Sequence, residues 1–309
     1  MSDKIYDLII IGGGPAGFTA GIYAKRSGLD VALIEKGVPG GAVAITYEVL
    51  NYPGIKQIGG PELATMMYEH AESLGVEMIF DEVKNTHLTD TVKTIECFGG
   101  TFKAYTVIIC IGAAARKLGL DNERQFIGKG ISYCATCDGS LFKDKDVAIV
   151  GGGNTALEDA VYMSNLAKHV YLIHRRDEFR GDDILVNDVK SRDNIELVLC
   201  SKPVKINGTD ALQSVEVENL ISKSIKTLDV AALFVSIGRG PDTEVIDKQV
   251  KINEAGYIIG DEKMQTNVDG VYVAGDIRQT PLRQIVTACS DGAIAATSAF
   301  TYIKTNKIK

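Results

Sequence analysis

The chain has 309 residues, 45% of them hydrophobic and 24% charged, with a formal net charge of −7. The length fits about two domains of ~150 residues, and the composition is ordinary for a soluble globular protein. The negative charge argues against a general nucleic-acid binder. No apolar run reaches the ~18 residues of a membrane span, and Leu8–Ile11 is too short for a signal-peptide core. We therefore expect no nucleic-acid or membrane partner.

A buried strand and a glycine-rich loop open the chain. Tyr6–Ile11 is predicted to be a parallel strand, and Gly12-Gly13-Gly14-Pro15-Ala16-Gly17 follows it with the spacing G-x-G-x-x-G. We predict a helix over Phe18–Ser27 and a second strand over Val31–Ile34, which leads to Glu35.

This order of elements is typical of a dinucleotide site. The first glycine makes a tight turn, the second lets the backbone approach a pyrophosphate, and the third permits close helix–strand packing. The helix N-terminus faces the negative charge. A strand-end carboxylate such as Glu35 accepts hydrogen bonds from a ribose. The alternative is a glycine-rich turn with a structural Glu35.

The next stretch is predicted to hold an ordered loop at 37–54, a helix and a small antiparallel layer. Pro61–Leu74 is the predicted helix. Its expected apolar face, which we interpret as core with a structural histidine, consists of Leu63, Met66, Met67, His70 and Leu74. The layer is expected from the strands Val76–Phe80, Lys93–Phe98 and Thr101–Lys103, followed by a buried strand Thr106–Ile111 that ends at Gly112.

Two of the six cysteines, Cys134 and Cys137, are closely spaced. A Cys-x-x-Cys pair can close a small disulfide ring that stores and releases two electrons. Because a secreted scaffold would not rely on so few cysteines, we expect a reducing cytoplasm. The remaining thiols are expected to be buried and inert: Cys97, Cys110, Cys200 and Cys289.

The chain then repeats its opening pattern at an offset of 139 residues, since 151 − 12 = 139. Asp146–Val150 is a predicted strand, Gly151-Gly152-Gly153-Asn154-Thr155-Ala156 has the form G-x-G-x-x-A, and a helix is expected to run through Ala167. Val170–Ile173 is the second strand. A repeat at a fixed offset makes chance a poor explanation for either copy.

The two copies differ at the end of the second strand. The position equivalent to Glu35 is His174, and Arg175, Arg176 and Arg180 follow it. Guanidinium groups bind phosphate in bidentate fashion, whereas a carboxylate there would repel it. The second site is therefore predicted to prefer the 2′-phosphate of NADPH over NADH. The alternative is a solvated basic strand end.

The rest of the chain adds further elements and a final buried strand. Leu228–Ile237 is a predicted strand that leads to the turn-rich stretch Gly238–Pro241. Val271–Asp276 is predicted to be the last buried strand, and a closing helix is expected from about Arg283 to Thr301. The remaining predicted elements are Asp182–Asn187, Ile195–Cys200 and Leu212–Glu218.

On these residues the chain resembles the low-molecular-weight, bacterial-type thioredoxin reductases over essentially its full length. The motifs are the two glycine loops, Cys134-Ala135-Thr136-Cys137-Asp138-Gly139, the segment 174–180, and Ala274-Gly275-Asp276 with Arg283-Gln284. The resemblance implies an α/β fold with two Rossmann-like, three-layer ββα dinucleotide-binding domains, the second inserted into the first. FAD-binding segments are expected at 1–115 and 244–309, and an NADPH-binding domain that carries the dithiol at 116–243. A homodimer is also implied.

The resemblance assigns cofactor contacts to individual positions. Those expected for FAD are Gly12, Gly14, Pro15, Ala16, Gly17, Glu35, Lys36, Gly41, Ala42, Asn51, Val83, Gly112, Ala113, Asp276, Arg283, Gln284 and Ile285. Those expected for NADPH are Gly153, Asn154, Thr155, His174, Arg175, Arg176, Arg180 and Ile237. Two positions depart from the family pattern: Ala42 replaces a common glutamine, which removes a hydrogen bond to the flavin, and Ile111 replaces a usual threonine.

The implied reaction passes electrons from NADPH to FAD, then to the Cys134–Cys137 disulfide and on to thioredoxin. By the resemblance, Cys137 lies nearest the flavin, Cys134 attacks the partner disulfide, and Asp138 protonates the leaving thiolate. We accordingly expect an exposed Cys134 and a buried Cys137. Turn-rich stretches at 112–119 and 238–241 are the expected hinges of a domain rotation.

Two alternatives stay open at this point. The acceptor is another thioredoxin-like protein or belongs to a peroxiredoxin system, although the latter usually needs an extra N-terminal redox domain and Tyr6 already begins the first strand. The second alternative is a non-enzymatic zinc-binding or redox-sensing flavoprotein. A structural zinc site needs about four ligands, and the chain offers one Cys-x-x-Cys and four scattered histidines, so we expect no metal.

Overall fold

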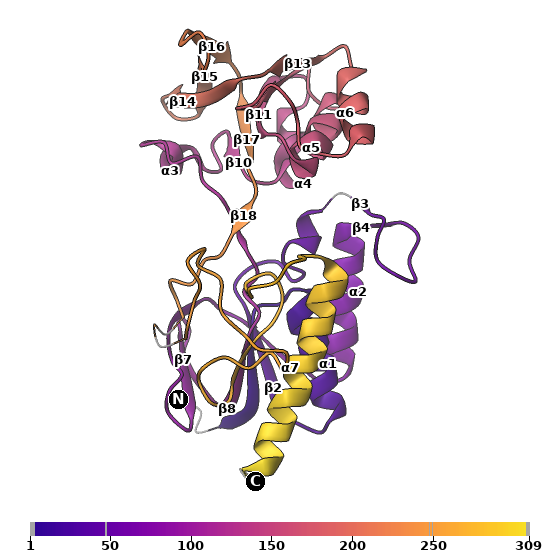
Figure 1. Cartoon of the computed structure of the whole chain (residues 1–309), viewed down its shortest axis with the longest axis vertical. Helices are drawn as coiled ribbons and strands as arrows, with labels where there is room; N and C mark the ends of the chain where they lie inside the picture. Colours follow the sequence, from indigo (N-terminus) through magenta and orange to yellow (C-terminus); the bar gives the residue numbers. More distant parts are fainter. Residues whose placement is uncertain (1–3, 47, 247, 249, 307–309) are drawn as a thin grey trace. The chain divides into compact units, whose positions relative to one another are not determined.

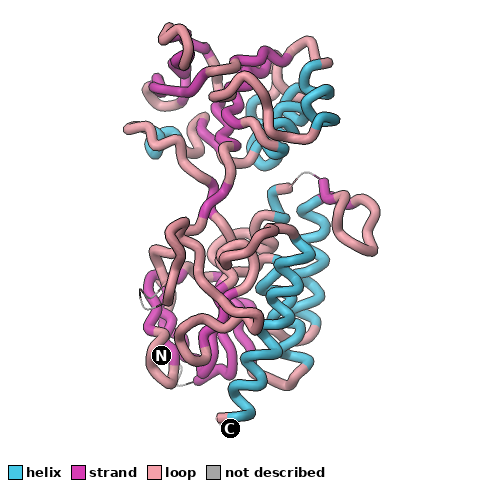
Figure 2. The backbone as a smooth tube through the Cα atoms, in the orientation of Figure 1, coloured by secondary structure: helices cyan, strands magenta, loops and turns pink. Residues whose placement is uncertain are grey.

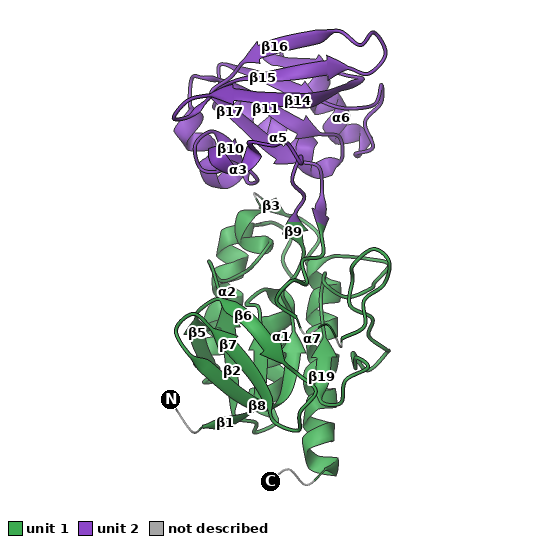
Figure 3. Ribbon diagram, turned by 90° about the vertical axis from the view of Figure 1, so that its left-hand side faces the viewer, with its two compact units in different colours: residues 1–114, 240–309 green, residues 115–239 purple. Residues whose placement is uncertain are grey.

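The computed structural model describes residues 4–46, 48–246, 248 and 250–306, so residue 47 of the expected 37–54 loop lies outside the described part. The chain forms two compact units, one from residues 1–114 with 240–309 and the other from 115–239 (Figure 3). The chain passes between them at β9 (Ala114–Ala115) and β18 (Arg239–Gly240), which pair with each other. Residues 240–243, assigned to the inserted domain from the sequence, group with the first unit.

The first unit is built on a mixed sheet with the order β5-β2-β1-β8-β7-β6, in which β19 also pairs with β8 (Figure 1). The pairs β5–β2, β2–β1, β1–β8 and β8–β19 are parallel, while β6 and β7 add an antiparallel extension to β8. The strands are β1 Ile5–Ile11, β2 Val31–Glu35, β5 Glu77–Phe80, β6 Val83–His87, β7 Lys93–Cys97, β8 Thr101–Ile109 and β19 Val271–Val273, with a short β3 Glu48–Val49 paired to β4 Ile58–Gly59.

Helices cover one face of this sheet. They are α1 Pro15–Arg26, α2 Gly60–Ser73 and α7 Ile285–Thr305, with the short η1 at Val43–Ile45. The core on this side joins Leu8, Ile10 and Leu33 of the sheet to alanines of α1 and α7. The helices α1 and α7 approach closely, since a Cβ atom on Gly292 would lie 2.2 Å from the Ala16 carbonyl oxygen. A second core on the opposite face is made of side chains such as Ile9, Ile34 and Ile95.

The second unit repeats this plan. A parallel sheet with the order β10-β17-β11-β12-β13 lies between helices and an antiparallel sheet, β14-β15-β16. The strands are β10 Ile131–Ser132, β11 Asp146–Gly151, β12 His169–Ile173, β13 Ile195–Val198, β14 Ser201–Gly208, β15 Leu212–Asn219, β16 Ile225–Asp229 and β17 Ala232–Ser236. The helices are α3 Glu123–Phe126, α4 Ala135–Asp138, α5 Asn154–Ser164 and α6 Asp183–Lys190, with η2 at Gly139–Phe142.

The predicted α/β class, with two Rossmann-like units, is confirmed, but several element predictions are wrong. The strand expected at Val76–Phe80 in an antiparallel layer is β5, which pairs in parallel with β2. The two strands expected over 101–111 form the continuous β8, and β6 was not predicted. The single strand expected at Leu228–Ile237 is broken at 230–231, where the chain leaves β16 of the antiparallel sheet and enters β17 of the parallel one.

The buried face of α2 also differs from the expectation. Leu63, Ala64 and Ala71 are buried, whereas Met66 is 50% exposed and Leu74 is 37% exposed. The buried face of α2 is therefore turned about the helix axis relative to the expected face, and Met66 is not part of the core. Among the described residues, no helix is both long and apolar enough to cross a membrane. The described residues between β18 and β19 run as loops and turns with isolated bridges (Figure 2).

Candidate functional site

The first glycine loop has the geometry of an anion cradle. Gly12 has a positive φ of 107°, and a Cβ atom there would lie 2.4 Å from the Cys110 carbonyl oxygen. A Cβ on Gly17 would lie 2.0 Å from the Gly12 oxygen, while the nearest atom to one on Gly14 is 3.9 Å away. Helix α1 begins at Pro15 and no side chain caps it. The first turn of α1 therefore keeps backbone N–H groups for a negatively charged ligand.

Glu35 ties the second strand to this loop. Its Oε2 atom accepts a hydrogen bond from the Gly13 N–H at 2.6 Å, and its Oε1 atom accepts one from the Gly37 N–H at 2.7 Å. The segment after Gly37 folds back onto the loop, since the Gly40 N–H donates to the Gly13 carbonyl at 2.6 Å. The expected acid thus stands at the loop, and Gly41 stands beside Gly14, where a Cβ would be 3.5 Å from its Cα.

Four more expected positions meet near the start of α7. The Asn51 amide donates to Gln284 Oε1 at 2.9 Å, although 233 residues separate them. Gln284 is the N-cap of α7 and exchanges hydrogen bonds with Thr287. The Arg283 Nε donates to the Asp276 carbonyl at 3.3 Å, and its guanidinium lies 4.0 Å from the Tyr257 ring centroid. The structure therefore brings residues 51, 276, 283 and 284 into one neighbourhood of the first unit.

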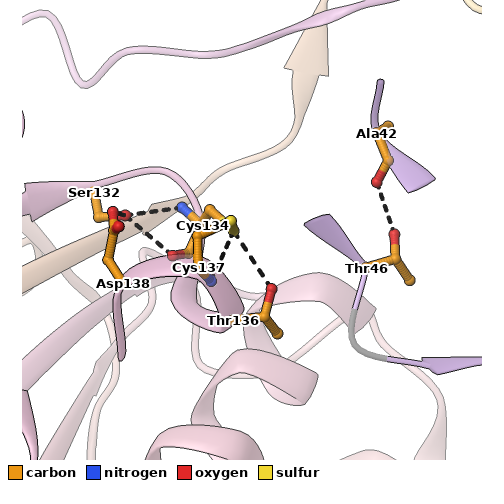
Figure 4. Close-up of a disulfide and its surroundings, with 7 residues drawn as sticks. All are labelled: Ala42, Thr46, Ser132, Cys134, Thr136, Cys137 and Asp138. Atoms are coloured by element: carbon orange, nitrogen blue, oxygen red, sulfur yellow. Dashed lines mark hydrogen bonds between the residues drawn. A yellow bond between two sulfur atoms is a disulfide. The ribbon is translucent and has the colours of Figure 1, made fainter. Parts of the chain in front are cut away.

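The other expected FAD positions are less uniform. Lys36 is exposed and pairs with Glu82 at 3.7 Å. Val83 is 7% exposed and packs in the core, so its side chain has no free surface for a ligand. Ala42 carries no polar side-chain atom, and its carbonyl accepts a hydrogen bond from the Thr46 hydroxyl at 2.9 Å (Figure 4). Gly112 has a φ of 68°, Ala113 is buried, and Ile285 packs against the cluster that contains Val43 and Leu63.

The second glycine loop has the same open form. Helix α5 begins at Asn154 without a side-chain cap, and nothing lies within 4 Å of a Cβ placed on Gly153. Asn154 and Asp182 form a reciprocal pair, in which the Asn154 amide donates to Asp182 Oδ2 at 2.8 Å and the Asp182 N–H donates to Asn154 Oδ1 at 2.9 Å. This pair holds the side chain of Asn154 at the loop, next to the exposed Thr155.

His174 fills space beneath this loop. It is 4% exposed, and a Cβ on Gly152 would lie 2.1 Å from its ring. Its Nε2 lies 3.1 Å from the Glu178 carbonyl oxygen, and its ring stacks on Phe179. Burial, followed by the charges of Arg180 and its neighbours, lowers the pKa of His174. The lowered pKa favours the neutral imidazole, which packs beneath the loop.

Unlike His174, the three arginines that follow it lie at the surface. Arg175, Arg176 and Arg180 are all exposed. In the part of the chain that the structure describes, none of them forms an ion pair with a carboxylate. The Arg180 N–H donates to the Gly152 carbonyl at 2.8 Å, so its backbone adjoins the glycine loop. Three exposed arginines thus follow the strand that ends beside the loop, with Asp177 and Glu178 between them in the sequence. Ile237 is 37% exposed and directly follows β17, whose last residue Ser236 pairs with Gly151 of the loop.

The predicted redox pair forms a disulfide between Cys134 and Cys137 (Figure 4). Cys134 precedes α4, and its Sγ accepts a hydrogen bond from the Cys137 N–H at 3.1 Å and lies 3.4 Å from Thr136 Oγ1. Asp138 accepts a hydrogen bond from the Ser132 hydroxyl at 2.6 Å. The exposures are the reverse of the expectation, because Cys137 is exposed and Cys134 is half-buried. Cys134 is the N-cap of α4, so its sulfur lies against the first turn of that helix.

Comparison with known proteins now gives the family. Residues 6–292 match the family model described as pyridine nucleotide-disulphide oxidoreductase. The chain belongs to this family. It is 44% identical to the thioredoxin reductase of Mycoplasma genitalium, over 94% of this chain and 93% of that one. It is 40% identical to the thioredoxin reductase of Bacillus subtilis, over 98% of this chain and 96% of that one.

The solved structures agree. The thioredoxin reductase of Lactococcus lactis matches with a TM-score of 0.91 and 38% identity, over 97% of this chain and 99% of that one. The expected resemblance to bacterial-type thioredoxin reductases is confirmed. The Cys134–Cys137 disulfide, in a pyridine nucleotide-disulphide oxidoreductase, is accordingly the redox-active disulfide that the sequence predicted.

Several polar residues of this oxidoreductase were not found from its sequence. Glu123, 2% exposed, accepts hydrogen bonds from the Leu118 and Gly119 N–H groups at 2.9 and 2.8 Å and from the Tyr133 hydroxyl. Burial and this hydrogen bond raise the pKa of Tyr133. Glu123 thus ties an expected hinge to the residue before Cys134. No local pattern marks it, because α3 is a single short turn.

Two more such carboxylates hold loop ends in place. Asp291 of α7, 6% exposed, pairs with Arg278 at 3.0 Å and accepts the Gly275 N–H at 3.2 Å. This pair anchors the segment around Asp276. Asp159 of α5 accepts a hydrogen bond from Ser236 at the end of β17. Burial, followed by the neighbouring Glu158 charge, raises the pKa of Asp159 to about 6 against the opposing effect of the Ser236 hydroxyl.

The remaining cysteines are free thiols, but only half of the burial prediction is correct. Cys97 and Cys110 are buried, and burial raises both of their pKa values, that of Cys97 to about 11. Cys200 and Cys289 are only half-buried. Within the described ranges, no group of three or more histidine, cysteine or acidic side chains is placed to hold a metal ion.

Proposed function

We propose that the protein is an NADPH-dependent flavoprotein that reduces the disulfide of thioredoxin. The observation that carries the proposal is the Cys134–Cys137 disulfide in a chain with two glycine loops. Each loop leads into a helix without a side-chain cap, and the second is followed by arginines that form no ion pair among the described residues. Relatives named thioredoxin reductase, matched over almost their full length, support it. A different thioredoxin-like acceptor remains the main alternative.

The first unit fits FAD. The open N-terminus of α1 suits a pyrophosphate, and Glu35 at the strand end suits a ribose. We assign the contacts to the FAD positions given above, with Val83 acting through its backbone because its side chain is in the core. FAD held by these residues would supply a group that can accept a hydride from nicotinamide and pass two electrons to a disulfide. We propose NADPH for the second loop, because Arg175, Arg176 and Arg180 carry charges that suit a 2′-phosphate.

The dithiol side chains then carry the exchange. The Cys134 thiolate attacks one sulfur of the thioredoxin disulfide, and the thiolate that leaves takes a proton from Asp138. Cys137 next gives up its proton and attacks the Cys134 sulfur, which restores the enzyme disulfide, and the second thioredoxin thiolate leaves and takes up that proton. Two electrons and two protons have then reached thioredoxin. The hydrogen bond from the Cys137 N–H and the nearby Thr136 hydroxyl favour Cys134 as the thiolate, although the exposures favour the reverse order.

We further propose a homodimer, a reducing cytoplasm and a rotation between the two units. The four free cysteines suit a reducing compartment. Gly112, Gly119 and Gly238 have φ values of 68°, 79° and 96°, and each has open space where a side chain would stand. Such positions absorb backbone changes with little steric cost, so the two stretches 112–119 and 238–241 suit hinges.

Turnover of the purified yellow protein tests the proposal. NADPH should be consumed when a bacterial thioredoxin is present and should produce free thioredoxin thiols, with the rate lost in Cys134→Ser. Flavin reduction without thiol production would leave the nucleotide half standing and overturn the acceptor. A colourless protein that takes up no FAD, or one zinc ion per chain by metal analysis, would favour the non-enzymatic alternative.

A further inference from the structure

We propose that Ser132 is a positioning residue, which fixes the Asp138 carboxyl group relative to the backbone of Cys134 so that Asp138 can transfer a proton to the leaving thiolate. The inference rests on the proposed function, because it concerns the acid of the same exchange step. It adds a residue outside the Cys-x-x-Cys-Asp motif to the machinery of that step. Neither the spacing of the motif nor any property of Ser132 in the sequence indicates this role.

The Ser132 hydroxyl is the centre of a small hydrogen-bond network (Figure 4). Its oxygen lies 2.6 Å from Asp138 Oδ2 and 3.1 Å from the Cys134 carbonyl oxygen, and it accepts the Cys134 N–H at 3.0 Å. The Asp138 N–H also donates to the Cys134 carbonyl at 3.2 Å. One side chain therefore contacts the carboxyl group and both backbone polar groups of the attacking cysteine.

A hydroxyl suits this position because it can serve both charge states of the acid. While Asp138 is a carboxylate, the single Ser132 proton goes to Oδ2, which is the shorter and charge-assisted bond. When Asp138 carries a proton, its O–H can donate to the Ser132 oxygen, and the hydroxyl proton can turn to the Cys134 carbonyl at 3.1 Å. Neither state leaves a polar group in this network without a partner, which would otherwise cost stability.

The strand holds the hydroxyl in place. Ser132 is 6% exposed and is the last residue of β10, which pairs in parallel with β17 in the register Ser132 to Phe234. Phe234 is fully buried, so the pair is part of the core. A side chain on such a strand has little freedom to move. The carboxyl of Asp138, at the end of a four-residue helix, has fewer constraints of its own.

The test measures two half-reactions by stopped flow in the intact FAD-loaded enzyme: flavin reduction by NADPH, and transfer from the prereduced enzyme to thioredoxin. Ser132→Ala should slow the transfer about tenfold, a part of the ~10²–10⁴-fold that a positioned acid contributes, and leave flavin reduction unchanged. Ser132→Thr, which keeps the hydroxyl, should restore most of the rate. Ser201→Ala is the matched control, since Ser201 is 4% exposed in the same unit and donates to the Leu199 carbonyl.

A double-mutant cycle with Asp138→Asn decides whether Ser132 acts through Asp138. The proposal predicts that Ser132→Ala costs less than about twofold in the Asp138→Asn enzyme. An equal loss in both backgrounds, no loss at all, or a fall in both half-reactions matched by Ser201→Ala would overturn it. If the unmodified enzyme fails to reduce thioredoxin, the proposed function has failed. The same cycle with a small aromatic disulfide as acceptor then still decides the role of Ser132.

Discussion

Removal of one guanidinium at a time tests the basis of nucleotide choice. Arg175, Arg176 and Arg180 are exposed, and among the described residues none pairs with a carboxylate, so each is free to bind a 2′-phosphate. A hydrogen bond to a charged group contributes about 1.5–3 kcal/mol. Exposure to water and salt favours the lower end of that range. About 1.4 kcal/mol corresponds to a tenfold change in a rate or equilibrium constant. Each change to alanine should therefore lower the second-order rate constant for flavin reduction by NADPH about tenfold.

The expected effect is selective, because NADH has no 2′-phosphate to lose. The assay is flavin reduction by stopped flow over a range of NADPH and NADH concentrations, with the ratio of the two second-order rate constants as the readout. Arg124→Ala, which removes an exposed arginine of α3 in the same unit, is the matched control and should leave the ratio unchanged. Equal rates with both nucleotides in the unmodified protein, or an unchanged ratio in all three variants, would refute the reasoning.

Three other outcomes follow from the structure. The pKa of Asp159 is raised from 3.8 to about 6, so its carboxyl costs no stability below about pH 4 and costs progressively more as the pH rises through 6. Asp159→Asn should therefore have a free energy of unfolding, measured by urea denaturation, that exceeds that of the unmodified protein by up to about 3 kcal/mol at pH 7 and equals it near pH 4. The opposite trend with pH would contradict this prediction. Glu35→Gln places an amide against the Gly13 or Gly37 N–H group, so it should lose FAD about tenfold or more faster on dialysis, and equal retention would remove Glu35 from the site. Cys137→Ser should accumulate a mixed disulfide between Cys134 and thioredoxin on a non-reducing gel, whereas accumulation in Cys134→Ser instead would reverse the two roles.

The glycine positions that the backbone requires were the features most directly predictable from the sequence. Gly12 and Gly17 were predictable because a side chain at either position would collide with the backbone. Glu35 and the three arginines could be found because each follows a strand whose position the glycine loop defines. The repeat at a fixed offset supported both loops at once. These features depend on short stretches of chain and on few residue types.

The missed features depend on contacts between distant segments. The direction of β5 depends on its pairing with β2 and not on its own apolar residues. The Ser132 network joins residues that are close in the sequence, but the strand that carries Ser132 is held by the pairing of β10 with β17, about a hundred residues further along the chain. The exposures of Cys134 and Cys137 follow from the turn of α4, while their spacing alone is symmetric. His174 occupies the position equivalent to Glu35 in the repeat, but this equivalence did not indicate that its ring is buried beneath Gly152.

The central claim is that electrons pass from NADPH through the flavin and the Cys134–Cys137 disulfide to thioredoxin. Single-turnover stopped flow of the Cys134→Ser enzyme tests it most directly. The account predicts that NADPH still reduces the flavin at the normal rate, and that added thioredoxin disulfide does not reoxidise it. Reoxidation of this flavin by thioredoxin at the rate of the unmodified enzyme would contradict the account, because the electrons would then reach the acceptor without the dithiol.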